Sequence, residues 1–412
     1  MRILWLCHFV PYPATGHGAL QRTHQLLIRS AESQTIGVIA LAPRTDTDDA
    51  QLIEARQFLE PRLAFLDLIP PSRGVFNSRP WAFAAAAVGR RSYWEHALWS
   101  GAMRQAMVRR IEEFRPDLVH FDTIYLARYV EAAGGCGVVL THHNIESELL
   151  AQRASVEKRG MRWFVRGQSR RVAELEKRLA PAVASNVVVS EADAATLQLI
   201  APGAPVSVVP NGVDTDFFSA ARTIAPTPKS LIFVGSMDWY PNRLAMDWLA
   251  AELWPALAQD DPERRMTVVG RNPPPSIVSA SRADERVAVT GFVDDVRPYM
   301  QRASIYLCPI RVGGGTRLKI LDALAMERPL VSTALGVSGL GLKDGCHYLQ
   351  AETVSDFVAQ VRRLEADPEL ATRLATAGRK FVVDHYAWPA VTDRLVGAFA
   401  AAANRRAIGT AE

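Results

Sequence analysis

The sequence predicts an α/β protein built from two doubly wound, Rossmann-like domains that face each other across a cleft. Short apolar, partly β-branched segments alternate with longer segments of helical periodicity, which is typical of parallel sheets covered by helices on both faces. This alternation stops near residue 210 and then begins again. The length of 412 residues is sufficient for two or three domains, each with its own core.

The first half of the chain contains six expected strands and four expected helices. The strands are Ile3–Phe9, Ile36–Leu41, Leu118–Phe121, Val138–Thr141, Val187–Val189 and Val206–Val209. The helices are Leu20–Arg29, Ser92–Phe114, Glu146–Leu179 and Ala192–Ile200.

The second half repeats the pattern after a linker. The linker is expected at 210–228, where Asn-Gly and two prolines occur without apolar periodicity. The strands are Leu231–Val234, Met266–Val269, Val287–Val289, Ile305–Cys308 and Leu330–Val331. The helices are Arg243–Leu257, Arg317–Met326, Val354–Leu364 and Pro368–Val383.

Composition excludes several classes of protein. The formal charge of +4 is too small to indicate a nucleic-acid binder, and no nucleic-acid partner is expected. The four cysteines form no CxxC pair, so neither a zinc site nor a disulfide framework is predicted, and a reducing, cytoplasmic compartment fits. The longest apolar run, Trp81–Gly89, is far below the ~20 residues that a membrane-spanning helix needs.

A glycine-rich segment, VGGGTRLK from Val312 to Lys319, follows the expected strand Ile305–Cys308. Its glycines let the backbone approach a ligand closely, and free amides at a helix N-terminus attract anions. Thr316 can cap the helix, while Arg317 and Lys319 add positive charge that suits a diphosphate. The combination favours an anion site over its alternative, a flexible turn beside a solvated arginine and lysine.

Two further features would fit a nucleotide. Asp322 lies three residues after Lys319, near the same helix face, where a carboxylate can accept hydrogen bonds from ribose hydroxyls. Alternatively, Asp322 is an exposed acidic residue on the helix surface with no ligand. The segment Pro13–Gly18 lies after the first strand, where open α/β sheets bind ligands, although a tight turn explains it equally well. It does not match GxGxxG, so a nicotinamide cofactor is disfavoured.

Polar side chains end two neighbouring strands of the first half. His142 and His143 follow Val138–Thr141, and a histidine at this end of a strand can act as acid, base or hydrogen-bond donor. His120 and Asp122 end the preceding strand in the same layer. One of these four groups is expected only to cap a helix or to satisfy the core. The HHxxE spacing does not match HExxH, so no metal site is predicted.

The positive charge is concentrated in the first half, which holds 24 basic and 20 acidic residues. Arg153–Arg178 and Trp81–Arg110 both combine basic with aromatic residues. Basic, aromatic, amphipathic helices can lie on anionic lipid, so a peripheral membrane contact is one interpretation. Aromatic residues that face the core behind a solvated arginine face are the alternative.

Several motifs occur in a fixed order along the chain. They are Val189–Glu191, Val209–Asp214, Phe233–Met237, Gly291–Val293 and the segment GGGTRLKILDALAMERPLVS. In this order the chain resembles the glycosyltransferase family 4 (group 1) enzymes. The similarity runs from the first strand to about residue 390 and is densest in the second domain.

This resemblance implies a GT-B fold and a division of the chain. An acceptor-side domain would cover residues 1–209, a linker 210–228 and a donor domain 229–385, with a helix at 386–406 that crosses back onto the first domain. It also implies sugar transfer from a nucleotide diphosphate donor, with retention of anomeric configuration and without a metal.

The resemblance also assigns roles to residues. His143 would orient or polarise the transferring sugar, and Arg317 and Lys319 would stabilise the departing nucleotide diphosphate. The donor residues would be Gly16, Gly18, Asn242, Phe292, Val293, Gly313, Gly314, Gly315, Thr316 and Asp322. The acceptor-side residues would be His120, Asp122 and His142.

The chain departs from the family pattern in its carboxylates and its cations. Gly314 and Asp322 replace the usual pair of glutamates, which leaves the identity of the sugar open. The basic pair expected after the first strand of the second domain is also missing, so Arg317 and Lys319 would carry the phosphate charge alone.

We therefore expect a retaining transferase that uses a UDP- or GDP-sugar and needs no cofactor. The acceptor would be a glycan or a lipid-linked glycan in bacterial polysaccharide or glycolipid assembly, in the cytoplasm or at the inner face of the membrane. Two alternatives remain, a non-catalytic partner that binds a nucleotide sugar and a GT-B nucleotide-sugar epimerase.

Overall fold

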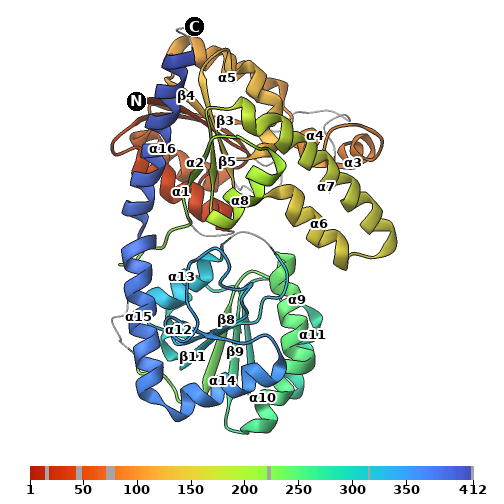
Figure 1. Cartoon of the computed structure of the whole chain (residues 1–412), viewed down its shortest axis with the longest axis vertical. Helices are drawn as coiled ribbons and strands as arrows, with labels where there is room; N and C mark the ends of the chain where they lie inside the picture. Colours follow the sequence, from red (N-terminus) through yellow and green to blue (C-terminus); the bar gives the residue numbers. More distant parts are fainter. Residues whose placement is uncertain (14–17, 43–48, 71–78, 220–223, 314–315, 410–412) are drawn as a thin grey trace. The chain divides into compact units, whose positions relative to one another are not determined.

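The structure, a computed structural model, describes residues 1–13, 18–42, 49–70, 79–219, 224–313 and 316–409 (Figure 1). It divides into two compact units. The first consists of Met1–Pro210 together with Pro389–Glu412, and the second of Asn211–Trp388. Each unit contains one parallel β-sheet with helices packed on it, as the alternating pattern predicts.

The first unit contains a seven-stranded sheet in the order β3-β2-β1-β4-β5-β6-β7, and all its pairs are parallel. The strands are β1 Arg2–Cys7, β2 Thr35–Leu41, β3 Phe65–Ile69, β4 Leu118–Phe121, β5 Gly137–His142, β6 Ser185–Val188 and β7 Val206–Val208.

The helices of the first unit differ from the expected ones in that Asp49–Leu59 and Arg79–Val88 were not expected and two expected helices are each divided. They are α1 Gly18–Ser30, α2 Asp49–Leu59, α3 Arg79–Val88, α4 Tyr93–Ala97, α5 Gly101–Phe114, α6 Glu146–Val156, α7 Arg159–Leu179 and α8 Glu191–Ile200, with 3-10 turns η1 Glu60–Arg62, η3 Ile124–Ala133 and η4 Ala180–Ala182. The expected helix 92–114 is two helices, because Ser100 caps α5 by accepting a hydrogen bond from the Met103 amide. The expected helix 146–179 is a hairpin of α6 and α7.

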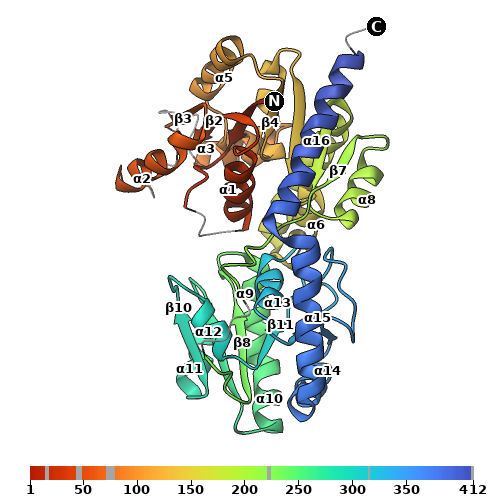
Figure 2. The same cartoon turned by 90° about the vertical axis from the view of Figure 1, so that its left-hand side faces the viewer.

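Both faces of the first sheet are covered. Leu4 and Leu6 of β1 pack in one cluster with Met107 of α5. Trp5 lies between them in sequence, and its ring is 6.1 Å from that of Phe399 in the last helix, α16 Trp388–Gly409. Because successive side chains of a strand point to opposite faces, α5 and α16 cover opposite faces of this sheet (Figure 2).

The second unit contains a six-stranded sheet in the order β10-β9-β8-β11-β12-β13. The strands are β8 Ser230–Val234, β9 Arg265–Val269, β10 Val287–Gly291, β11 Ile305–Cys308, β12 Leu330–Ser332 and β13 Leu349–Gln350. The helices are α9 Tyr240–Trp248, α10 Trp254–Asp260, α11 Pro275–Ala283, α12 Arg297–Arg302, α13 Leu318–Ala325, α14 Val354–Ala366 and α15 Pro368–Tyr386, with a π-helical turn η5 Leu249–Leu253 between α9 and α10.

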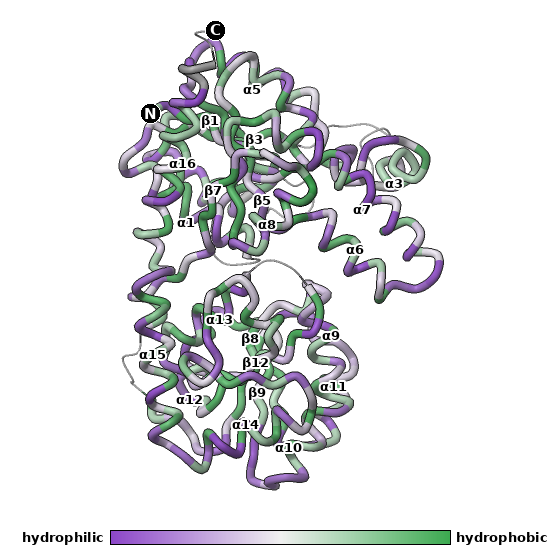
Figure 3. The backbone as a smooth tube through the Cα atoms, viewed as in Figure 1, coloured by the Kyte–Doolittle hydropathy of each residue, from purple (hydrophilic) through white to green (hydrophobic). Residues whose placement is uncertain are grey.

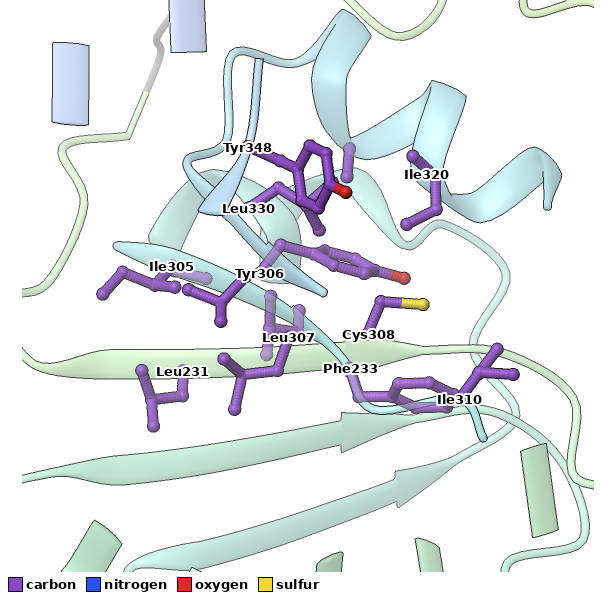
Figure 4. Close-up of a cluster of buried hydrophobic side chains, with 14 of the residues drawn as sticks. Leu231, Phe233, Ile305, Tyr306, Leu307, Cys308, Ile310, Ile320, Leu330 and Tyr348 are labelled. Atoms are coloured by element: carbon purple, nitrogen blue, oxygen red, sulfur yellow. The ribbon is translucent and has the colours of Figure 1, made fainter. Parts of the chain in front are cut away.

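The core of the second unit lies around β8 and β11. Phe233, Tyr306 and Cys308 are fully buried, together with Ile320 of α13 (Figure 4). These apolar side chains fix the carboxyl ends of the two central strands and the start of α13. Of the predicted donor residues, Gly313 and Thr316 lie in the loop that leaves β11, whereas Phe292 and Val293 follow β10. Asn211 and Val213, which lie in the expected linker, are buried in this unit, and Val213 forms a β-bridge with Ala387.

Candidate functional site

The second unit brings Lys319 and Asn242 together at the carboxyl end of β8. Gly235 follows this strand directly, and a Cβ atom there would lie 2.4 Å from Lys319 Nζ and 3.0 Å from Asn242 Nδ2. A side chain at position 235 would therefore occupy the space in which the two polar groups meet. Asn242 is held in turn by a 2.6 Å hydrogen bond from its Nδ2 to the Ser236 carbonyl.

Lys319 is a largely buried cation. Its Nζ donates a 2.5 Å hydrogen bond to Asn242 Oδ1 and lies 4.4 Å from the centre of the Phe233 ring. Burial lowers the pKa of Lys319 to about 8; Asp322 opposes this shift and Arg317 adds to it. Among the residues that the structure describes, no carboxylate oxygen lies within 4.0 Å of this nitrogen.

Arg317 lies in the same loop and is 8% exposed. Its guanidinium donates a 3.0 Å hydrogen bond to the Gly313 carbonyl. Gly313 has a φ of 116°, and a Cβ atom there would lie 2.8 Å from Pro241, so this position requires glycine. This hydrogen bond to Gly313 holds the Arg317 guanidinium at the start of α13.

The prediction that Thr316 caps the helix is wrong. Arg317 occupies the N-cap position of α13, and its side chain makes no capping hydrogen bond. The Thr316 hydroxyl instead accepts a 2.7 Å hydrogen bond from Asn211 Nδ2. Thr316 therefore anchors the loop to the start of the second unit, and the first amides of α13 have no side-chain cap from the N-cap residue.

Asp322 is partly buried one turn further along α13. Burial raises its pKa to about 8, and the positive charge of Lys319 only partly opposes this shift. A carboxyl group that keeps its proton near neutral pH can both donate and accept a hydrogen bond, which suits a pair of hydroxyls.

Phe292 and Val293 follow β10. The Phe292 side chain is 56% exposed, and the Arg271 guanidinium lies 4.7 Å from the centre of its ring. Val293 packs against the core of the second unit. An exposed aromatic ring beside a cation is a surface on which a planar base can stack.

A hollow of about 260 Å³ lies beside the loop between β11 and α13. Its lining comes from α9 and this loop: Leu244, Ala245, Trp248, Pro309, Arg311 and Val312.

The first unit brings Asp122 and His143 together. His143 Nε2 lies 3.4 Å from Asp122 Oδ2, which also accepts a 2.8 Å hydrogen bond from the Thr23 hydroxyl of α1. Burial raises the pKa of Asp122, but the charge of His143 and its hydrogen bond outweigh this effect and lower the pKa overall. Asp122 is therefore an ionised, almost fully buried carboxylate that fixes the ring of the partly exposed His143.

His120 and His142 are core residues, each 1% exposed. His120 Nε2 lies 2.7 Å from the Thr141 hydroxyl, and His142 Nε2 lies 3.0 Å from Asn186 Oδ1. Burial lowers the pKa of His120 to about 3 and that of His142 to about 4, so both rings are neutral. His143 therefore differs from His120 and His142 in two respects. Its side chain is partly exposed, and it pairs with the ionised carboxylate of Asp122.

Three predicted site residues lie outside the described residues, namely Gly16, Gly314 and Gly315. Gly18 is the first residue of α1 and is exposed. Within the described ranges, no three histidine, cysteine or acidic side chains are placed to hold a metal ion.

Sequence reasoning missed part of the first-unit site. Tyr125 donates a 3.0 Å hydrogen bond to Glu146, which also accepts one from Asn144 beside His143. Asn144 and Glu146 belong to the HHNIE segment, so the sequence could have indicated that these two polar residues lie beside His143. Tyr125 and Thr23 come from other elements, and only the fold brings them here.

Two family models match the chain, one in each half. "Glycosyltransferase Family 4" matches residues 68–217, and "Glycosyl transferases group 1" matches residues 228–367. The chain is 27% identical over 207 residues to a phosphatidyl-myo-inositol mannosyltransferase from Mycobacterium leprae, a match that covers 48% of this chain and 54% of that protein. The match thus spans about half the length of this relative.

A longer match is to a glycogen synthase from Mycobacterium tuberculosis, 26% identical over 332 residues, which covers 74% of this chain and 75% of that one. Among solved structures, sucrose-phosphate synthase from Thermosynechococcus elongatus superimposes with a TM-score of 0.73 at 16% identity, with full coverage of both chains. Anabaena Alr3699/HepE in complex with UDP-glucose gives 0.67 at 12% identity, over 97% of this chain and 99% of that one. At such low identity these structures show the fold alone.

Proposed function

Because this chain belongs to the GT-B glycosyltransferases of family 4 and group 1, we propose that it transfers a sugar from a nucleotide diphosphate donor to an acceptor. The donor is a UDP- or GDP-sugar, and the acceptor is a glycan or a lipid-linked glycan of a bacterial polysaccharide or glycolipid. The transfer retains the anomeric configuration and uses no metal.

Lys319 is the observation that carries this proposal. It is a largely buried ammonium group whose described neighbours include an amide, an aromatic face, a carboxyl with a raised pKa and a second cation, Arg317. A buried cation is unfavourable unless an anion compensates it, and a diphosphate supplies that anion. Its pKa of about 8 leaves it protonated at neutral pH and ready to pair with the ligand.

The roles of the other donor residues follow from this placement. Arg317 is the N-cap residue of α13, directly before the first amides of this helix. Its guanidinium and these amides would stabilise the charge that develops on the departing diphosphate. Asp322 would hold the ribose hydroxyls, and Phe292 would lie beside the base. The UDP-glucose complex of Anabaena Alr3699/HepE supports this class of donor.

His143 is the proposed group for the transferring sugar. It is the most exposed member of the histidine cluster formed with His120 and His142, and Asp122 orients its ring through Nε2. When Nε2–H donates to Asp122, Nδ1 is the nitrogen left for a substrate, and it is buried without a hydrogen-bond partner among the described residues. A protonated ring would donate from Nδ1 to a substrate oxygen, and a neutral ring would accept there.

A thermal-shift screen against UDP-, GDP- and ADP-sugars tests the donor assignment. A ligand that binds only the native state at 100 times its Kd stabilises the protein by about 2.7 kcal/mol, so the correct base raises the melting temperature by several degrees. If none of the nucleotide sugars raises it, the donor site is wrongly assigned.

The two alternatives differ in their products. A transferase releases free UDP or GDP when an acceptor is present, an epimerase returns an epimerised nucleotide sugar, and a non-catalytic partner binds the donor unchanged. Chromatography of the nucleotide pool after incubation with a glycolipid extract separates these outcomes.

A further inference from the structure

The α6–α7 hairpin projects from the first unit as an arm (Figure 1). α6 ends at Val156 and α7 begins at Arg159, so a tight turn joins the two helices. The apolar face of α7 packs inward through Val165, Val172 and Leu175. Figure 3 shows purple, hydrophilic segments along both helices.

Both flanks of α7 are covered by other helices. On one side the ring of Phe164 stacks on that of Phe83 from α3 at 4.2 Å, and Arg171 donates a 2.8 Å hydrogen bond to the carbonyl of Gly89. On the other side the Ser169 hydroxyl donates a 2.8 Å hydrogen bond to the carbonyl of Ser147 in α6. One face of α7 therefore remains directed outward.

That outward face carries a mainly basic stripe, which the exposed Glu174 interrupts between Arg170 and Lys177. Arg159, Trp163, Arg166, Arg170 and Lys177 follow one another at intervals of three, four or seven residues, which places them on one side of a helix. All five are exposed. Among the described residues, none of the four cations of this stripe takes part in a hydrogen bond or an ion pair.

The turn of the hairpin adds apolar groups to this charge. Val156 is 48% exposed, Met161 42% and Trp163 71%, and Lys158 lies between them in sequence, also exposed. Exposed apolar side chains at the tip of an arm, surrounded by basic ones, have the composition of an interfacial membrane anchor. A tryptophan prefers the level of the lipid headgroups.

We propose that the tip of the α6–α7 hairpin and the outer face of α7 bind an anionic lipid bilayer. Lysine and arginine attract acidic headgroups, and Val156, Met161 and Trp163 enter the boundary between headgroups and acyl chains. A nucleic acid would also attract the cations, but it offers no apolar layer for three exposed side chains of which two are aliphatic. The proposal does not rest on the proposed function, because membrane binding needs no donor or acceptor.

The other basic and aromatic segment, Trp81–Arg110, also exposes apolar and basic side chains. Phe83 is 44% exposed, Val88 90% and Trp94 46%, and Arg90 and Arg91 are exposed. Phe83 lies against Phe164 of α7, so part of this surface adjoins the hairpin, whereas other groups of the segment are held within the unit. Arg110 forms a two-pronged ion pair with Asp67 of β3, at 2.7 Å for each nitrogen. Trp99 stacks on Tyr129 at 5.1 Å and is covered by the Arg128 guanidinium. The Arg110 guanidinium and the Trp99 ring therefore already have partners within the first unit.

Co-sedimentation of the full chain with vesicles tests the proposal. Vesicles of phosphatidylcholine with about a third phosphatidylglycerol should bind the protein, whereas pure phosphatidylcholine should not. Each arginine near an anionic surface contributes about fivefold to partitioning, so Arg159→Glu with Arg166→Glu should lower it at least about 25-fold. Raising the salt to 0.15 M, where the Debye length is about 8 Å, should weaken binding of the wild type.

A matched variant controls for net charge. Arg104→Glu with Arg282→Glu changes the charge by the same amount at exposed positions elsewhere, and should leave partitioning within about twofold of wild type. Equal losses in both double variants would overturn the proposal. So would binding to an RNA homopolymer at a salt concentration at which anionic vesicles do not bind.

Insertion of the tip is measured separately with brominated lipids, which quench tryptophan at the bilayer. The chain has nine tryptophans, so the signal of Trp163 is the difference between wild type and Trp163→Phe. Quenching should disappear in Trp163→Phe while vesicle binding persists. Equal quenching in both proteins would show that another surface inserts.

Discussion

Replacement of Lys319 by methionine should stabilise the second unit. Burial lowers the pKa of Lys319 from 10.5 to about 8, which corresponds to about 3 kcal/mol of unfavourable free energy for the charged form in the folded state. Methionine has a similar length and no charge. The hydrogen bond to Asn242 is lost, at a cost of about 1 kcal/mol, so we expect a net gain of about 1–2 kcal/mol at pH 7.

The effect of Lys319→Met on the free energy of unfolding should depend on pH. A lysine whose pKa is lowered by folding destabilises the folded state fully below about pH 8, and the penalty disappears as the pH rises from there to the unfolded value. The stability difference between Lys319→Met and wild type should therefore be largest at pH 7 and approach zero or reverse near pH 10.

Nucleotide binding should change in the opposite direction. Removal of one charge-assisted contact to a diphosphate costs about 1.5–3 kcal/mol, so the Kd for UDP or GDP should rise about 10- to 100-fold in Lys319→Met. Urea denaturation at the two pH values and calorimetric titration of the nucleotide measure the two effects. Lys343→Met, at an exposed lysine of the same unit, should change neither. A destabilised Lys319→Met variant with unchanged nucleotide affinity would refute the reasoning.

Three further perturbations test other parts of the site. Gly235→Ala places a Cβ atom 2.4 Å from Lys319 Nζ and should weaken nucleotide binding at least about tenfold, whereas Gly397→Ala, at an open position, should not. His143→Ala should lower turnover by about 10²–10⁴ while leaving the nucleotide Kd unchanged; a wild-type rate would remove it from the mechanism. Burial raises the pKa of Glu176 to about 7, so stability should be complete below about pH 4.5 and fall by up to about 3 kcal/mol as the pH rises through 7. Glu176→Gln should abolish that dependence, as urea titrations at several pH values would show.

The sequence predicted the architecture because the central strands are short and largely apolar. Ile305–Cys308 and Leu118–Phe121 are strands with the predicted bounds. The edge strand Phe65–Ile69 was not predicted, because Asp67 interrupts its apolar run and pairs with Arg110 of α5. Edge strands lack a partner on one side, so their sequences carry a weaker apolar signal.

The candidate site was predicted where local motifs carry it. The glycine-rich segment named Arg317 and Lys319 correctly as neighbours at the start of a helix. The partner of Lys319, Asn242, lies 77 residues away, and only the parallel order of β8 and β11 brings the two together. Among the histidines, the spacing alone did not separate His143 from His142, since adjacent residues differ in burial only once the strand has packed.

Nucleotide release is the measurement that tests the central claim most directly. The wild type, incubated with a UDP- or GDP-sugar and a bacterial glycolipid extract, should release free nucleoside diphosphate in step with sugar incorporated into the extract. His143→Ala should release it at the background rate while still binding the nucleotide. Tight binding of every nucleotide sugar without any release by the wild type would contradict a transferase, and equal release by wild type and His143→Ala would contradict the site.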